Sequence, residues 1–109
     1  MIMTNLRKLA RGKSCMVRLP GICNHDPATT VLAHYRLGGT CGAGMKPSDW
    51  QGAWACSACH DAVDGRTEPY LDNTMRRLSH AEGVLRTQHA IREMVKRGEI
   101  DGAKLNLPI

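Results

Sequence analysis

Residues 55–64 read Ala55-Cys56-Ser57-Ala58-Cys59-His60-Asp61-Ala62-Val63-Asp64, and this stretch decides the fold that we expect. Two cysteines three positions apart at the start of a helix can direct both thiolates at one tetrahedral metal ion. Gly65 follows directly, and a glycine in this position typically ends a helix. The stretch therefore predicts half of a metal site, followed by a short helix over about 57–64.

A second pair of cysteines would complete a site of four sulfur atoms. Cys15 and Cys23 have seven residues between them, and Pro20-Gly21 predicts a turn that returns the second thiol toward the first. We expect a strand that starts at Cys15 and ends at this turn. We therefore predict a structural Zn²⁺ site with four ligands: Cys15, Cys23, Cys56 and Cys59.

The fifth cysteine, Cys41, lies in a glycine-rich stretch over 38–47 that we expect to form a loop. We expect its thiol to be free; the alternative is that it replaces Cys15 or Cys23 as a zinc ligand. The basic N-terminal residues contain no apolar run of the kind that a secretory signal needs, so we expect the chain to stay in a reducing cytoplasm. In that compartment paired cysteines bind metals more often than they form disulfides.

The composition favours a small protein that binds a polyanion. The 109 residues carry fifteen Lys and Arg against ten Asp and Glu, and the net charge of +5 favours a nucleic acid as partner. There are no Phe, two Trp and two Tyr, and a core of smaller side chains gains stability from a structural metal. No stretch approaches the roughly 18 consecutive apolar residues of a membrane span, so we expect no membrane partner.

The remaining pattern predicts two strands and a short first helix. Residues 29–35 are rich in β-branched and aromatic side chains, and we expect a strand that ends near His34. Residues 50–56 are expected to return beside this strand. A short helix is expected over 4–11, and the last ten residues are expected to form a frayed tail.

A long C-terminal helix is predicted after Pro69. Apolar residues recur there at intervals of three and four as far as Gly98, which is typical of an amphipathic helix that covers a core. Its arginines and lysines are expected to lie mostly on the solvated side rather than to contact DNA. The residues of the expected buried face are Leu71, Met75, Leu78, Ala81, Leu85, Ile91, Met94 and Val95.

His60 and Asp64 lie one helical turn apart, so their side chains share one face of the helix that follows the second cysteine pair. An imidazole nitrogen and a carboxylate oxygen in this arrangement can hold a divalent cation. A pair of this kind is more often a simple surface contact. Its attachment to the zinc-binding stretch, and the presence of His34 at the end of a strand that can pack beside the helix, favour a functional site.

These motifs resemble the HNH (ββα-metal) nuclease superfamily and, more specifically, the small YbcO-type nucleases of lambdoid prophages. The resemblance covers about residues 5–68. It rests on the Cys-x7-Cys pair, on Leu32-Ala33-His34, on a Lys-Pro loop at 46–47 and on the block over 55–61.

The resemblance implies an α+β fold, a zinc-stapled unit of a two-stranded ribbon and a short helix that is followed by a long C-terminal helix. We expect one domain over 1–109, with the motif core at about 15–66 and the C-terminal helix at about 70–98.

The resemblance also implies roles for individual residues. His34 takes the place of the general base that removes a proton from water. His60 takes the place of a ligand to the catalytic ion, and Asp64 stands where most members have a second histidine. Aspartate is a good ligand for Mg²⁺ or Mn²⁺, so we expect Mg²⁺ or another divalent cation in addition to zinc.

The sequence departs from the family pattern in two places. Many members have an acidic ion ligand directly before the base, where this chain has Ala33. The asparagine that normally orients the base is not evident, and Asp49 and Gln51 are the candidates to replace it.

The function implied is that of an endonuclease that hydrolyses DNA phosphodiester bonds, encoded by a phage or prophage and active in the bacterial cytoplasm. Arg36, Lys46 and Arg66 are candidate phosphate contacts, with solvated loop charges as the equal alternative. A homodimer is conceivable because one such site cuts one strand. The alternatives are a non-catalytic zinc module that binds nucleic acid or protein, and a redox protein that uses Cys56 and Cys59 as a dithiol.

Overall fold

The computed structural model describes residues 4–42 and 44–105. Strands β1 (Val31–His34) and β2 (Gly52–Ala55) form a two-stranded antiparallel sheet in which His34 lies opposite Gly52. The predicted α+β class, with a two-stranded ribbon and a long C-terminal helix, is therefore confirmed.

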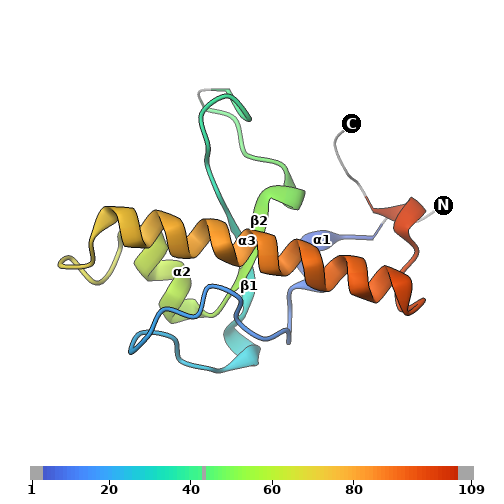
Figure 1. Cartoon of the computed structure of the whole chain (residues 1–109), viewed down its shortest axis with the longest axis horizontal. Helices are drawn as coiled ribbons and strands as arrows, with labels where there is room; N and C mark the ends of the chain where they lie inside the picture. Colours follow the sequence, from blue (N-terminus) through green and yellow to red (C-terminus); the bar gives the residue numbers. More distant parts are fainter. Residues whose placement is uncertain (1–3, 43, 106–109) are drawn as a thin grey trace.

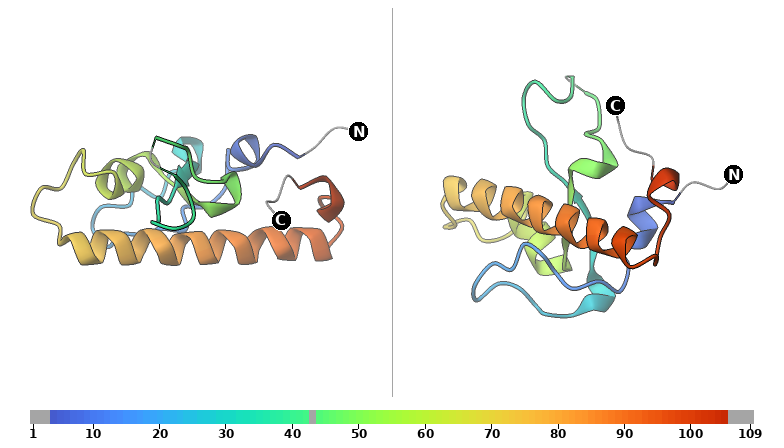
Figure 2. Two further views of the ribbon diagram at one scale, coloured as in Figure 1. Left: turned by 90° about the horizontal axis from the view of Figure 1, so that it is seen from above. Right: turned by 45° about the vertical axis from the view of Figure 1, so that its right-hand side comes forward.

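The helices surround this ribbon, and the longest of them, α3, runs along one side of the rest of the molecule (Figures 1 and 2). None of the helices in the described part of the chain is long and apolar enough to cross a membrane. The helical elements are α1 (Leu6–Leu9), α2 (Ser57–Val63) and α3 (Asn73–Lys96), together with three 3-10 turns, η1 (Pro27–Thr29), η2 (Asp49–Gln51) and η3 (Gly102–Lys104).

Strand β2 is buried along its whole length and divides the core in two. Its alanines, Ala53 and Ala55, belong to a first cluster that is built around the cysteines. Trp54, between them, belongs to a second cluster with residues of α1, β1 and α3. The second cluster consists of Leu6, Ala10, Leu32, Trp54, Ile91 and Met94.

Helix α3 approaches the sheet closely through small and polar side chains. A Cβ at Gly83 would lie 2.9 Å from Val17 Cγ2 and 3.2 Å from Ala53 Cβ, so only glycine fits at this crossing. Four positions further along, the Thr87 hydroxyl accepts a hydrogen bond of 2.9 Å from the backbone N–H of Trp54. The helix thus supplies an acceptor to the outer edge of β2, which within the described residues pairs with β1 alone.

The predicted buried face of this helix is wrong in its first half. Met75, Leu78 and Leu85 are 47%, 51% and 65% exposed. The reason is the close approach of α3 to β2, because the residues between them must be small or must form hydrogen bonds, whatever their hydrophobicity. Only Ile91 and Met94 of the predicted face are fully buried, and the other buried residues are Ser79, His80, Gly83, Val84 and Thr87.

The segment that carries the first cysteine pair is a series of turns, and the strand predicted from Cys15 is absent from it. One backbone bond, from Met16 N to Trp54 O at 2.7 Å, ties the segment to β2. Arg18 then adopts a positive φ of 56°, which ends any extended run. The predicted turn at Pro20-Gly21 is confirmed, because the N–H of Cys23 donates to Leu19 O at 2.9 Å.

The two ends of the described chain lie together. Helix α1 is shorter than predicted, and the Asn5 side chain caps it by accepting from Arg7 N at 3.0 Å. The expected frayed tail is wrong for residues 100–105, because η3 forms there and Thr4 N donates to Lys104 O at 2.7 Å. The rest of that tail, 106–109, lies outside the described residues.

Candidate active site

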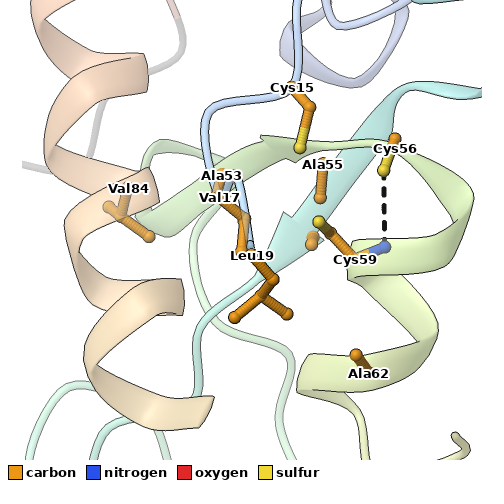
Figure 3. Packing of buried hydrophobic residues seen from close by; sticks show 10 residues of the cluster. Cys15, Val17, Leu19, Ala53, Ala55, Cys56, Cys59, Ala62 and Val84 are labelled. Carbon is orange, nitrogen blue, oxygen red and sulfur yellow. Dashed lines mark hydrogen bonds between the residues drawn. The ribbon is translucent and has the colours of Figure 1, made fainter. Parts of the chain in front are cut away.

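The sulfur atoms of the four predicted zinc ligands all lie within 4.8 Å of one another. Cys56 is the N-cap of α2 and Cys59 lies in its first turn, and Figure 3 shows both beside Cys15. Cys15 and Cys23 come from the turns before η1. The Sγ atoms of Cys23 and Cys56 are 3.8 Å apart. Four bonds of about 2.3 Å around a tetrahedral zinc ion place sulfurs about 3.8 Å apart, so the donor set fits this ion.

Hydrogen bonds and burial shift the pKa values of these thiols in opposite directions. The Cys59 thiol is hydrogen-bonded to the Cys15 sulfur, which lowers the pKa of Cys15 to about 4. The same bond and burial raise the pKa of Cys59, and burial raises the pKa of Cys23. Cys56 and Cys59 are both 0% exposed. A redox dithiol needs an accessible thiol, so the burial of both sulfurs argues against the redox alternative.

Cys41 lies outside this group. Its Sγ is 3.9 Å from a guanidinium nitrogen of Arg36 and 3.9 Å from Leu37 O. Arg36 also donates to Met45 O at 2.6 Å. Arg36 therefore holds the loop that follows β1. The structure thus gives Arg36 a structural role, which differs from both predicted roles, a phosphate contact and a solvated loop charge.

His34 ends β1 and pairs with Asp49, which η2 places beside it. His34 Nε2 and Asp49 Oδ1 are 2.7 Å apart, and the other carboxylate oxygen lies 3.6 Å from Arg7 Nε. Gln51, the second candidate to orient His34, instead donates to Tyr35 O at 2.7 Å and to Thr40 Oγ1 at 2.9 Å. Asp49 is therefore the residue that can fix the orientation and the tautomer of this imidazole.

His60 and Asp64 meet on one face of α2, as their spacing predicts. His60 Nε2 lies 3.2 Å from Asp64 Oδ2, and both side chains are about one-third exposed, at 30% and 33%. Arg66 pairs with the same carboxylate oxygen at 2.9 Å and with Asp61 at 2.9 Å. The hydrogen bond to Asp61 raises the pKa of Arg66.

A small pocket of about 130 Å³ brings the two halves of this site together. His34 lines it from the end of β1, Asp64 from the end of α2, and α3 supplies a third wall. His60 does not line the pocket and reaches it through its contact with Asp64. The full lining is His34, Tyr35, Arg36, Val63, Asp64, Arg76, Arg77 and His80.

The wall from α3 is the part that the sequence does not predict. His80 is 6% exposed, and its Nε2 lies 2.9 Å from Ala33 O, which makes Nε2 the donor. Burial lowers the pKa of His80 and favours its neutral form. The spacing of Arg76, Arg77 and His80 places them on one face of α3 and is a signal for this wall of the pocket. The apolar pattern instead predicted that a different face of the helix is buried.

Comparison with known proteins places the chain in a family. The family model described as "Putative nuclease YbcO" matches residues 4–96. The chain belongs to the YbcO family. The match extends from α1 to the end of α3 and so includes every site residue described above. The family resemblance expected from the cysteine pairs and the Leu-Ala-His strand is confirmed at this level.

Two curated YbcO relatives are each 52% identical to the chain over 86 residues, which is 79% of this chain and 88% of the relative. They are "Putative nuclease YbcO" of Escherichia coli (strain K12) and "Putative nuclease ybcO" of Enterobacteria phage 82. A solved structure, described as that of a putative bacteriophage protein from Escherichia coli str. K-12 substr. MG1655, is similar with 44% identity and a TM-score of 0.68. The match covers 86% of this chain and 100% of that one.

Proposed function

We propose that this chain is a metal-dependent endonuclease of the HNH type that hydrolyses DNA phosphodiester bonds in a phage or prophage context. One observation carries the proposal: His34, hydrogen-bonded to Asp49, lines the same small pocket as Asp64, the C-cap of α2. The names of the relatives from Escherichia coli and phage 82 support a nuclease, and the net charge of +5 suits a polyanionic substrate.

His34 is the group that takes the proton from water. The Asp49 carboxylate can only accept, so the proton of the neutral imidazole resides on Nε2 and Nδ1 keeps a free lone pair. A base with this orientation removes a proton from water as the water attacks phosphorus.

His60 and Asp64 would hold the catalytic cation. One imidazole and one carboxylate on a partly exposed helix face leave room for water ligands, which Mg²⁺ and Mn²⁺ both retain in proteins. When bound, this cation supplies positive charge at the phosphate oxygens, where negative charge accumulates during hydrolysis. A zinc ion on the four cysteines would hold the first turn of α2, which carries Cys56 and Cys59, and would thereby set the direction in which His60 and Asp64 point.

The experiment that tests the function is cleavage of supercoiled plasmid by the purified zinc protein. Cutting is expected when Mg²⁺, Mn²⁺ or Ni²⁺ is added and none when divalent ions are withheld. Because one site cuts one strand, nicked circles indicate independent monomers and direct conversion to linear DNA indicates a dimer. No cutting with any ion, while salt-sensitive DNA binding and bound zinc are retained, would replace this proposal with the non-catalytic zinc module.

Asp49→Ala is expected to lower kcat by about 10- to 100-fold, the usual effect of removing a group that orients a functional histidine. Asp49→Asn keeps an acceptor oxygen and should recover part of the loss. The measurement is the plasmid cleavage rate at saturating DNA. Asp101→Ala, which removes an exposed aspartate that caps η3, is the matched control. Equal rates for Asp49→Ala and Asp101→Ala would show that Asp49 does not position the base.

A further inference from the structure

We propose that Arg77, on α3 and outside the strand–helix motif, binds the phosphodiester that enters the pocket beside His34 and Asp64. The inference rests on the proposed nuclease function and adds a phosphate-binding residue to it. The arginines around the pocket differ in how many of their N–H donors already bond to other groups of the protein.

Three of these arginines are committed to the protein itself. Arg36 donates to Met45 O at 2.6 Å and to Gly42 O at 3.4 Å. Arg66 is paired with two carboxylates of α2 and of the turn that ends it. Arg76 donates to four backbone carbonyls, those of Ala62, Thr67, Glu68 and Leu71.

Arg77 is held in place but keeps most of its donors. Its Cζ lies 4.9 Å from the centroid of the Tyr35 ring, and Nη2 donates to Arg36 O at 3.3 Å. Within the described residues neither Nε nor Nη1 has a hydrogen-bond partner, and the side chain is exposed. The contact with Tyr35, the residue after the proposed base, and the bond to Arg36 O hold the guanidinium at the edge of the pocket.

The chemistry of the pocket indicates what Arg77 would bind. A volume of about 130 Å³ is well below the roughly 300 Å³ of the smallest sites for drug-sized ligands, so the pocket admits only a small group, and the three arginines in its lining favour an anion such as a phosphate. The planar guanidinium offers paired donors that match two non-bridging phosphate oxygens. A phosphodiester held in this way would lie between Arg77, His34 and Asp64, which come from three different elements.

The test measures DNA binding separately from cleavage. Binding of a fluorescein-labelled DNA duplex is followed by anisotropy over a series of salt concentrations. Three proteins are compared, all in the His34→Ala background: the one that keeps Arg77, Arg77→Ala and Arg77→Lys. Arg92→Ala is the matched control, because Arg92 is also exposed on α3 and also lies over an aromatic ring, Trp50, at 5.9 Å. Thermal melting of each variant confirms that the fold is retained.

Arg77→Ala is expected to weaken binding about 10-fold and to reduce the slope of log K against log salt by about 0.9, the value for one lost phosphate contact. Arg77→Lys keeps the charge and should keep the slope. With the base restored, Arg77→Lys should still cut more slowly than the wild type, because a lysine cannot hold two oxygens in one plane. Arg92→Ala should bind DNA as its His34→Ala parent does. With the base restored, it should cut DNA as the wild type does.

Two results separate this inference from the nuclease proposal. If the wild type cuts DNA and Arg77→Ala binds and cuts like Arg92→Ala, the role of Arg77 is overturned and the nuclease stands. If the wild type does not cut with any ion, the nuclease proposal and the role of Arg77 in it both fall. A slope that changes equally for Arg77→Ala and Arg92→Ala would also overturn the inference, since it indicates general charge attraction.

Discussion

His34→Ala is expected to lower the rate of plasmid cleavage by about 10²- to 10⁴-fold, the usual contribution of a positioned general base. The side chain is 18% exposed, and the hydrogen bond that the structure gives its ring is the one to Asp49. The substitution therefore removes the proposed base and leaves the four cysteines and the turns that carry them untouched. Zinc content and melting temperature, measured beside the cleavage rate, are expected to stay close to those of the wild type.

The control for this prediction is His89→Ala. His89 is an exposed histidine of α3 and does not line the pocket. Its loss removes the same chemical group and should leave the rate unchanged. If His34→Ala retains zinc and cuts as fast as His89→Ala, the base lies elsewhere and the assignment by family resemblance is wrong.

The sequence predicts well those features that depend on residues close together in the chain. Cys56 and Cys59 are three residues apart at a helix start, and the spacing alone brings their sulfurs to one side. The pair His60 and Asp64 follows from the period of the helix in the same way. The turn at Pro20-Gly21 follows from the conformations that these two residues prefer.

The parts that it predicts poorly depend on contacts between distant segments. Asp49 meets His34 across fifteen residues because β1 and β2 pair in one register, and the sequence alone does not decide between Asp49 and Gln51. The inward face of α3 depends on how closely the helix approaches β2. Thr87 is buried because its hydroxyl satisfies a strand N–H, a requirement that hydrophobic periodicity does not contain.

Cys59→Ser is expected to abolish zinc binding and to unfold the part of the protein that forms the active site. The first core cluster is built from cysteines and small side chains; it includes three of the four predicted ligands, of which Cys56 and Cys59 are fully buried. Structural zinc contributes on the order of 10–16 kcal/mol of apparent binding free energy to small zinc proteins. Whole domains are stable by only about 5–15 kcal/mol, so the cluster is not expected to persist without the ion.

The measurement is zinc content by metal analysis together with far-UV circular dichroism and thermal melting. Cys41→Ser is the matched control, because Cys41 lies outside the group of four sulfurs and its loss should leave one zinc ion and the melting temperature unchanged. The second cluster contains Trp54 and no cysteine, and Trp50 packs against it, so tryptophan emission distinguishes partial from complete unfolding in the Cys59 variant. If Cys59→Ser retains a full equivalent of zinc and an unchanged melting temperature, the four-sulfur site is wrong. The ion would then have to be sought at His60 and Asp64, the pair that we assign to catalysis.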